Sequence, residues 1–117
     1  MKALIVDDNM LNIKVIMKLL EKIGCSSNYV TNGFDCIKDI KNNSYDVIFM
    51  DIMMPEMDGV ETFKKLKSID KFDIPIVAQT ADAVIGAREK YLSIGFDEYI
   101  SKPIHLDELK NIINKIS

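Results

Sequence analysis

Several short apolar runs in this sequence end in a polar residue of a kind that does chemistry. These residues are Asp7, Asp8, Asp51, Thr80 and Lys102. Three carboxylates in one small site repel one another. A hard divalent cation relieves that repulsion, and Mg²⁺ prefers oxygen ligands of this kind. If the apolar runs are neighbouring strands, the residue types predict a magnesium site.

A carboxylate beside such a cation can also act as a nucleophile and form an aspartyl phosphate. Lys102 can place a point charge on a phosphoryl oxygen, and Thr80 can donate its hydroxyl proton to another. The set therefore predicts Mg²⁺-assisted transfer of a phosphoryl group to a carboxylate. For Asp7 and Asp8 taken alone, one alternative stays open: they could cap a helix that begins near Asn9.

Five strand-like runs alternate with five helical patterns along the chain. We expect the strands at residues 3–6, 27–31, 47–50, 76–78 and 98–101, and the run 27–31 is polar enough for an edge strand. We expect the helices at residues 12–23, 34–40, 60–67, 87–94 and 106–116. This alternation predicts a parallel sheet with helices on both faces. Ligands bind at the carboxyl ends of such strands, where the polar residues lie.

Length and composition exclude several classes of protein. The 117 residues fit one domain, 1–117, with no repeat or linker. A net charge of −3 argues against nucleic acid as a partner. Two isolated cysteines and a single histidine argue against a disulfide framework or a zinc site. We find neither a signal peptide nor an apolar run of membrane-spanning length, so we expect a cytoplasmic domain without membrane contact.

Taken together, the motifs resemble the receiver domain of bacterial two-component response regulators. The matching segments are Asp7-Asp8, Asp51, Met54-Pro55-Glu56-Met57-Asp58-Gly59, Thr80-Ala81 and Tyr99 through Lys102-Pro103. Each motif is weak alone, but their order and their placement at strand ends are specific. The resemblance covers essentially the whole chain, and it implies a doubly wound, flavodoxin-like α/β fold with strand order 2-1-3-4-5.

The resemblance implies a role for each residue of the acidic site. Asp51 is expected to accept a phosphoryl group from a phosphohistidine on a histidine kinase or a histidine-phosphotransfer protein. Mg²⁺ is expected to be held by Asp51, by Asp8 directly, by Asp7 largely through water and by the main-chain carbonyl of Met53. The domain would then be a signalling switch and not an enzyme that turns over a diffusible substrate.

The resemblance also implies a switch. Lys102 is expected to bridge to Asp51 and the phosphate, and its bond to Pro103 is expected to be cis. Thr80 would turn toward the phosphoryl group, and Tyr99 would follow from an outward to an inward rotamer. The change would affect the fourth helix and the fifth strand.

A few residues near these motifs allow two interpretations. Met53 and Asp82 lie at positions that govern water access in this family, but both could be solvent-facing loop residues. His105, the only histidine, is expected to be a surface residue at a helix start. Gly86 is expected early in the fourth helix, where it would weaken the helix by about 1 kcal/mol. We expect Met54 and Met57 to pack against the loop after the third strand.

The first helix is apolar on more than one face. A core stripe is expected at Val15, Ile16, Leu19, Leu20 and Ile23. The other apolar residues, with one after the fifth strand, are expected to dock the phosphohistidine partner: Met10, Leu11, Ile13, Met17 and Pro103. The alternative is partial burial against a neighbouring helix. We expect a monomer, with dimerisation on phosphorylation left open.

Two other functions fit the site less well. Haloacid dehalogenase-like phosphatases need an aspartate two residues after the nucleophile, where this chain has Met53. A flavodoxin-like cofactor carrier needs a Ser/Thr/Gly-rich loop after the first strand, and Asp7 and Asp8 would repel a phosphate there. The motif sequences are most similar to those in receivers of hybrid histidine kinases and relay regulators. The sequence leaves open whether the domain acts alone or within such a kinase.

Overall fold

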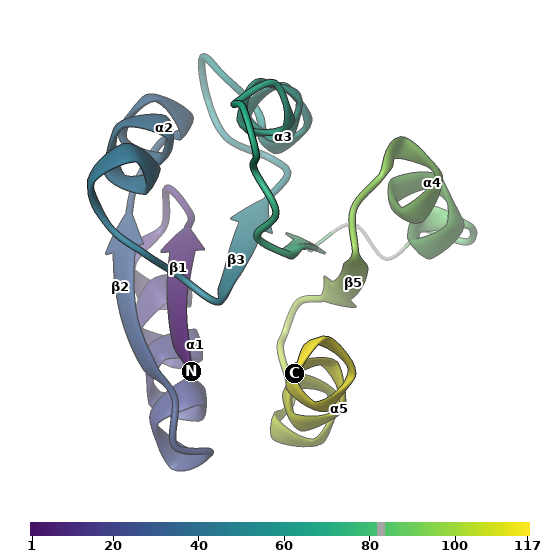
Figure 1. The fold of residues 1–117 in the computed structure, drawn as a ribbon. Helices are drawn as coiled ribbons and strands as arrows, with labels where there is room; N and C mark the ends of the chain where they lie inside the picture. The colour runs from purple at the N-terminus through teal and green to yellow at the C-terminus, as the bar shows by residue number, and fades with distance from the viewer. Residues whose placement is uncertain (82–83) are drawn as a thin grey trace.

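A five-stranded parallel sheet forms the centre of the molecule, in the order β2-β1-β3-β4-β5 (Figure 1). The computed structural model describes residues 1–81 and 84–117. The strands are β1 (Lys2–Val6), β2 (Ser26–Val30), β3 (Val47–Asp51), β4 (Ile76–Thr80) and β5 (Glu98–Ser101). The predicted fold class and strand order are confirmed.

Helices cover both faces of the sheet. They are α1 (Met10–Lys22), α2 (Gly33–Asn42), α3 (Gly59–Lys67), α4 (Ala87–Ile94) and α5 (Leu106–Ile116). α1 and α5 lie on one face, and α2, α3 and α4 lie on the other (Figure 1). Within residues 1–81 and 84–117, we find no helix with the length and apolarity that a membrane span requires.

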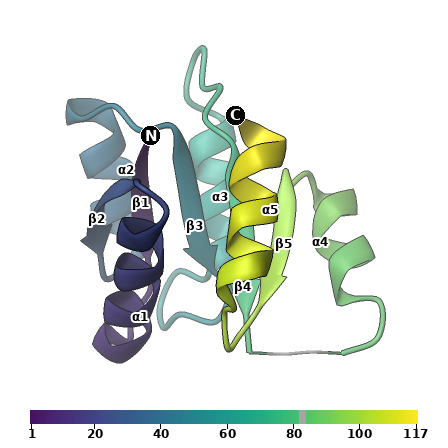
Figure 2. The ribbon, with the colours of Figure 1, turned by 90° about the horizontal axis from the view of Figure 1, so that it is seen from below.

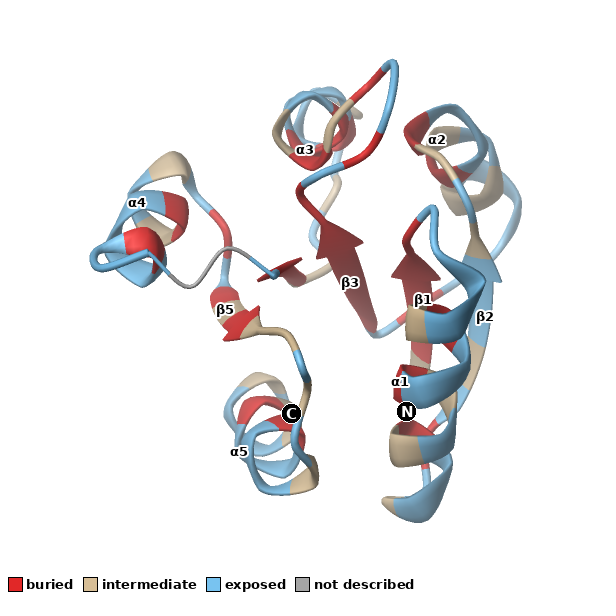
Figure 3. Cartoon of the chain, turned by 180° about the vertical axis from the view of Figure 1, so that it is seen from behind, coloured by how far each residue is buried: buried red, intermediate tan, exposed pale blue. Residues whose placement is uncertain are grey.

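The two faces of the sheet supply two apolar layers. Successive side chains of a strand point to opposite faces, so Ile5 packs toward α1 and α5 while Leu4 packs toward α2 and α3. β1, from Ala3 onward, and β3 are buried throughout, whereas much of β2 is exposed as the predicted edge strand (Figure 3). A polar residue at the end of a buried central strand therefore lies at the carboxyl edge of the sheet.

Both chain ends lie at the opposite edge. β1 begins beside Met1, and α5 runs back along the sheet, so that Ser117 also lies near the amino ends of the strands (Figure 2). The strand arrows in this view point away from both termini. Neither chain end is therefore near the carboxyl edge.

The buried face of α1 differs from the predicted one. Ile13, Ile16 and Leu20 are buried, while Val15 is 45% exposed. The predictions that Val15 belongs to the core and that Ile13 is available for docking are therefore wrong. α1 carries apolar residues on almost every side, so periodicity alone allowed two registers. The packing of α1 on the sheet selects the register that contains Ile13.

The prediction for Gly86 also needs correction. Gly86 precedes α4 and has a φ of 87°, in the left-handed region that glycine adopts easily. It therefore ends the preceding loop and does not weaken the helix from within. Gly95, with a φ of 127°, ends the same helix. α4 is thus bounded by a glycine at each end.

Candidate functional site

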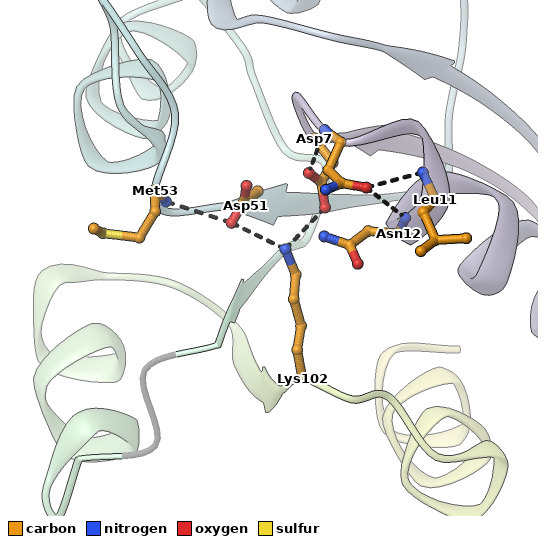
Figure 4. Close-up of polar contacts among 7 residues, drawn as sticks. Asp7, Leu11, Asn12, Asp51, Met53 and Lys102 are labelled. Carbon is orange, nitrogen blue, oxygen red and sulfur yellow. Dashed lines mark hydrogen bonds and ion pairs between the residues drawn. The ribbon is translucent and has the colours of Figure 1, made fainter.

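Two buried carboxylates and one ammonium group meet at the carboxyl edge of the sheet. Asp7 and Asp51 are 1% and 3% exposed. Lys102 reaches across from the end of β5, and its Nζ lies 2.9 Å from Asp7 Oδ2 and 3.3 Å from Asp51 Oδ1 (Figure 4). Charge-assisted contacts of this kind are strong because they lie mostly out of water. The sequence-based grouping of these three residues is confirmed.

The backbone after each strand holds the two carboxylates in place. The N–H of Asn9 donates to Asp7 Oδ1 at 2.9 Å. The N–H of Met53 approaches Asp51 Oδ1 at 3.4 Å (Figure 4). Each chain turn after a strand therefore supports its own carboxylate.

Asn9 caps α1, which answers the alternative left open for the aspartates. Its Oδ1 accepts hydrogen bonds from the N–H groups of Leu11 and Asn12, at 2.9 and 3.1 Å. These are the first donors of a helix, which need such a partner. The alternative that Asp7 and Asp8 cap the helix is therefore wrong, and both remain available to the site.

The acidic cluster has the donor set of a hard-cation site. Asp7, Asp8 and Asp51 each offer one carboxylate oxygen, and these oxygens lie within 4.8 Å of one another. Asp8 is exposed, so the cluster opens to solvent on that side. Three negatively charged oxygens suit Mg²⁺, which binds few protein ligands and keeps several waters. The part of Met53 in such a site stays a prediction.

Burial makes the ionised form of Asp51 unfavourable. Burial, followed by repulsion from Asp7, raises the pKa of Asp51 to about 6, although Lys102 acts in the opposite direction. A divalent cation in the cluster would favour the carboxylate. The acidic site therefore favours additional positive charge, because Lys102 neutralises only part of its negative charge.

The predicted switch residues lie next to this cluster. Thr80 is the last residue of β4 and is fully buried, and its carbonyl oxygen accepts a hydrogen bond from the N–H of Lys102 at 2.9 Å. Tyr99 in β5 is half-buried, and its ring stacks on Tyr91 of α4 with 5.9 Å between centroids. The bond between Lys102 and Pro103 is cis, as predicted.

An exposed apolar surface borders the cluster. Met10, Leu11 and Val15 of α1 are 40%, 71% and 45% exposed, and we call these three residues the α1 strip. Met17, which was expected to dock a partner, is half-buried against the core. Beside the strip lies a cavity of about 140 Å³, whose lining is Asp7, Leu11, Asn12, Val15, Gln79, Lys102, Pro103 and Ile104.

Sequence reasoning missed Gln79. It lies in β4, next to Thr80, its side chain is buried, and its Oε1 has no hydrogen-bond partner. A signal was available, because a lone polar residue in the apolar run of a central strand needs a reason.

The remaining predictions near the site have mixed outcomes. Met54 and Met57 are buried, as expected for residues that pack against their loop. Met53 is 69% exposed at the mouth of the site. His105 is exposed at the start of α5. Asp82 lies outside the described residues.

Comparison with known proteins identifies the family. Residues 3–114 match the model of the response regulator receiver domain. Hybrid signal transduction histidine kinase L of Dictyostelium discoideum is 40% identical over 97% of this chain, which corresponds to 7% of that kinase. The histidine-protein kinase BarA of Escherichia coli K12 is 34% identical over 97% of this chain and 12% of the kinase.

Solved structures agree with this. The receiver domain of a sensor histidine kinase from Pseudomonas aeruginosa, crystallised with a magnesium ion in its active-site cleft, has a TM-score of 0.86 and 31% identity, with 97% of this chain and 94% of that one covered. A Francisella response regulator receiver domain has a TM-score of 0.87 and 30% identity, with 98% and 94% covered. The chain belongs to the response regulator receiver domain family of two-component and phosphorelay signalling.

Proposed function

We propose that residues 1–117 act as one receiver domain in which Asp51 accepts a phosphoryl group from a phosphohistidine. The observation that carries this is the position of Asp51, buried at the carboxyl edge of the sheet between Asp7 and Lys102. A lone structural ion pair would not need a further carboxylate beside it. The domain is then a signalling unit, which we expect in the cytoplasm.

In the transfer, a carboxylate oxygen of Asp51 forms a bond to phosphorus. The phosphorus–nitrogen bond of the phosphohistidine breaks, and its electron pair stays on the imidazole. The ammonium of Lys102, already 3.3 Å from Asp51, neutralises charge on the phosphoryl oxygens. The product is an aspartyl phosphate, which holds the signal until water removes it.

Asp7, Asp8 and Asp51 are the residues that would hold Mg²⁺, with the main-chain carbonyl of Met53 as a further ligand. When bound, the cation lowers the repulsion among the carboxylates and neutralises phosphoryl charge. The three oxygens within 4.8 Å and the raised pKa of Asp51 support this assignment. The magnesium ion in the related Pseudomonas receiver is consistent with it.

The α1 strip, with Pro103, is the surface we propose for docking the partner. Leu11, Val15 and Pro103 line the cavity that Asp7 and Lys102 also line, so a protein seated there lies beside the lysine that contacts Asp51. The occupant is the helical bundle of a histidine kinase or histidine-phosphotransfer protein. Met17 stays at its edge, whereas the buried Ile13 does not take part.

Phosphorylation would change the α4–β5 side of the molecule. Thr80 lies in β4 between Asp51 in β3 and Tyr99 in β5, in strands that pair directly. The stack of Tyr99 on Tyr91 connects β5 to α4. A rotation of Thr80 toward the phosphoryl group would therefore alter the packing of α4.

The assignment is tested with a small phosphodonor. Acetyl phosphate with Mg²⁺ should add one phosphoryl group to the protein, seen as an increase in intact mass. The adduct should be absent without Mg²⁺ and in Asp51→Asn. Replacement of the exposed Asp70 by Asn is the matched control and should label normally. An adduct that persists in Asp51→Asn would show that another residue is the acceptor.

A further inference from the structure

The proposed reaction does not explain why the polar side chain of Gln79 is buried. It is 1% exposed, and its Oε1 is buried without a hydrogen-bond partner. Among residues 1–81 and 84–117, no other buried side-chain nitrogen or oxygen is in this position. An unsatisfied buried carbonyl destabilises the fold, because it has lost its hydrogen bonds to water. Such a group needs an explanation, and a partner in another state of the protein is one.

The place of Gln79 in the sheet brings it to the acidic site. In the pairing of β3 with β4, Gln79 is opposite Asp51. Its neighbour two residues earlier, Val77, faces α1 and α5, and side-chain alternation gives Gln79 the same direction. Accordingly, Gln79 lines the 140 Å³ cavity together with Asp7 and Lys102.

Within the described ranges 1–81 and 84–117, the ammonium of Lys102 has one donor more than it has acceptors. An ammonium group carries three N–H donors, and its partners here are Asp7 and Asp51. Both carboxylates also belong to the oxygen cluster that suits a divalent cation. Two cations thus depend on the same oxygens, and like charges repel. Lys102 needs an acceptor outside that cluster when the cluster is filled.

We propose that Gln79 is a positioning residue for Lys102, whose ammonium donates to Gln79 Oε1 when the acidic cluster holds its cation. A neutral carbonyl attracts an ammonium without adding charge to a crowded acidic site. The long stem of Lys102 can turn within the cavity that both residues line. This inference rests on the proposed function, because it concerns the state that is ready for phosphoryl transfer.

The test compares three proteins with wild type. Gln79→Leu removes the acceptor and nearly keeps the volume. Gln79→Glu keeps an Oε1 at the same place. Asn12→Leu makes a similar polar-to-apolar change elsewhere in the lining of the same cavity and is the matched control. Each protein is titrated with beryllofluoride in saturating Mg²⁺, and the ¹⁵Nζ and ¹³Cε resonances of Lys102 are recorded by NMR with and without the ligand.

Loss of one hydrogen bond to a charged group should weaken beryllofluoride binding by about tenfold in Gln79→Leu. The Lys102 resonances should also shift in this variant in saturating Mg²⁺, before beryllofluoride is added. Gln79→Glu keeps an acceptor oxygen, so its Lys102 ammonium should remain hydrogen-bonded at this position, with resonances that differ from those of Gln79→Leu. In metal-free protein, Gln79→Leu should unfold at the same urea concentration as wild type or a higher one, because the unsatisfied carbonyl is gone.

Three outcomes would overturn the proposal. Unchanged affinity and unchanged Lys102 resonances in Gln79→Leu would indicate that an ordered water satisfies Oε1. An equal loss in Asn12→Leu would assign the effect to cavity polarity. If wild type binds no beryllofluoride, the proposed function fails, and the inference fails with it. Wild-type binding together with unaffected variants contradicts the inference alone.

Discussion

The ionisation of Asp51 connects the chemistry of the site to the stability of the fold. The pKa of this carboxyl is about 6 in the folded protein against an ordinary value of 3.8, because burial and Asp7 oppose the charge. The folded state therefore takes up this proton at a higher pH than the unfolded chain. As pH rises from about 4 to about 6, the metal-free protein loses stability through this group.

It follows that Asp51→Asn should stabilise the metal-free protein at pH 7.5, by about 1–3 kcal/mol. The amide resembles the protonated carboxyl, so the gain should shrink at pH 5, where wild-type Asp51 is protonated. Urea unfolding in a chelator at both pH values measures the difference. Asp70→Asn is the control, and an equal gain in that variant, or a gain that grows at pH 5, would contradict the explanation.

Among the residues of the site, the charged ones could be predicted from the sequence, whereas the neutral Gln79 could not. Asp7, Asp51 and Lys102 stand out because ionisable groups at the ends of apolar strands have few structural uses. Gln79 looks like an ordinary strand residue until its burial and its unsatisfied oxygen are known. Those two properties depend on neighbours that are distant in the sequence.

Among the elements, the turn from β3 into α3 fixes the position of the phosphoacceptor. A Cβ added to Gly59 would lie 2.3 Å from the Asp51 carbonyl oxygen and 2.7 Å from Ile52 Cα. Only a residue without a side chain allows this approach. The glycine therefore keeps the start of α3 against the end of β3.

Gly59→Ala should lower the free energy of unfolding by about 1–3 kcal/mol and slow labelling by acetyl phosphate. Backbone atoms of Asp51 itself must move to admit the methyl group. Gly33→Ala provides the contrast, because its Cβ would meet the side chains of Thr62 and Met57 instead. It should lose stability and keep its labelling rate. Equal labelling rates in both folded variants would disprove the role given to Gly59.

In the part of the chain that the structure describes, α4 is linked to β5 by an ion pair. Its first residue follows Gly86, which offers no side-chain cap, and Gly95 ends it. Besides its buried Ala87 and Tyr91, it is tied to β5 by Arg88, whose guanidinium lies 2.5 Å from the buried Glu98. Burial raises the pKa of Glu98, but the hydrogen bond from Arg88 and further contacts outweigh it, so the pKa lies below its ordinary value.

Arg88→Ala should therefore loosen α4 without unfolding the domain. We expect backbone amide exchange in α4 to accelerate by about two- to fivefold, since a partly exposed ion pair contributes modestly. Lys115→Ala removes the other cation near Glu98, 3.5 Å away on α5, and serves as the control. Amide exchange in α4, measured by mass spectrometry, should be faster in Arg88→Ala than in Lys115→Ala. If α4 exchanges at the wild-type rate in Arg88→Ala, the ion pair does not hold it.

Element boundaries were predictable because apolar periodicity and glycine stops are local signals. β2 starts one residue earlier than expected, at Ser26, and ends at Val30. The orientation of α1 was not predictable, because Ile13 and Val15 are equally apolar. Only the contact of α1 with the sheet and α5 decides which of them is buried.

At the scale of the whole molecule, three exposed apolar residues near the site lie together on α1. The α1 strip borders the cavity beside Asp7 and Lys102. Leu11→Ser with Val15→Ser should sharply reduce phosphoryl transfer from a phosphohistidine protein. Labelling by acetyl phosphate should stay normal, because neither residue supports the core. Equal loss in both assays would mean that these residues support the fold.

A matched variant controls this experiment. Val84→Ser with Ile85→Ser removes two exposed apolar residues near α4, away from α1. Transfer from the phosphohistidine protein should be unaffected. A similar loss in both double variants would indicate that the partner docks over a wider surface or binds through nonspecific hydrophobic contacts. Either result would contradict a specific role for the α1 strip.

The placement of the two chain ends has a consequence for how this unit can be built into larger proteins. Met1 and Ser117 lie at the edge of the sheet away from Asp51 (Figure 2). A polypeptide joined to either end leaves the molecule near the amino ends of the strands, away from the acidic site. The same unit can therefore be fused to many neighbours, in either order, without obstruction of its reactive edge. Modularity of this kind is a geometric property of the fold, independent of what any neighbour does.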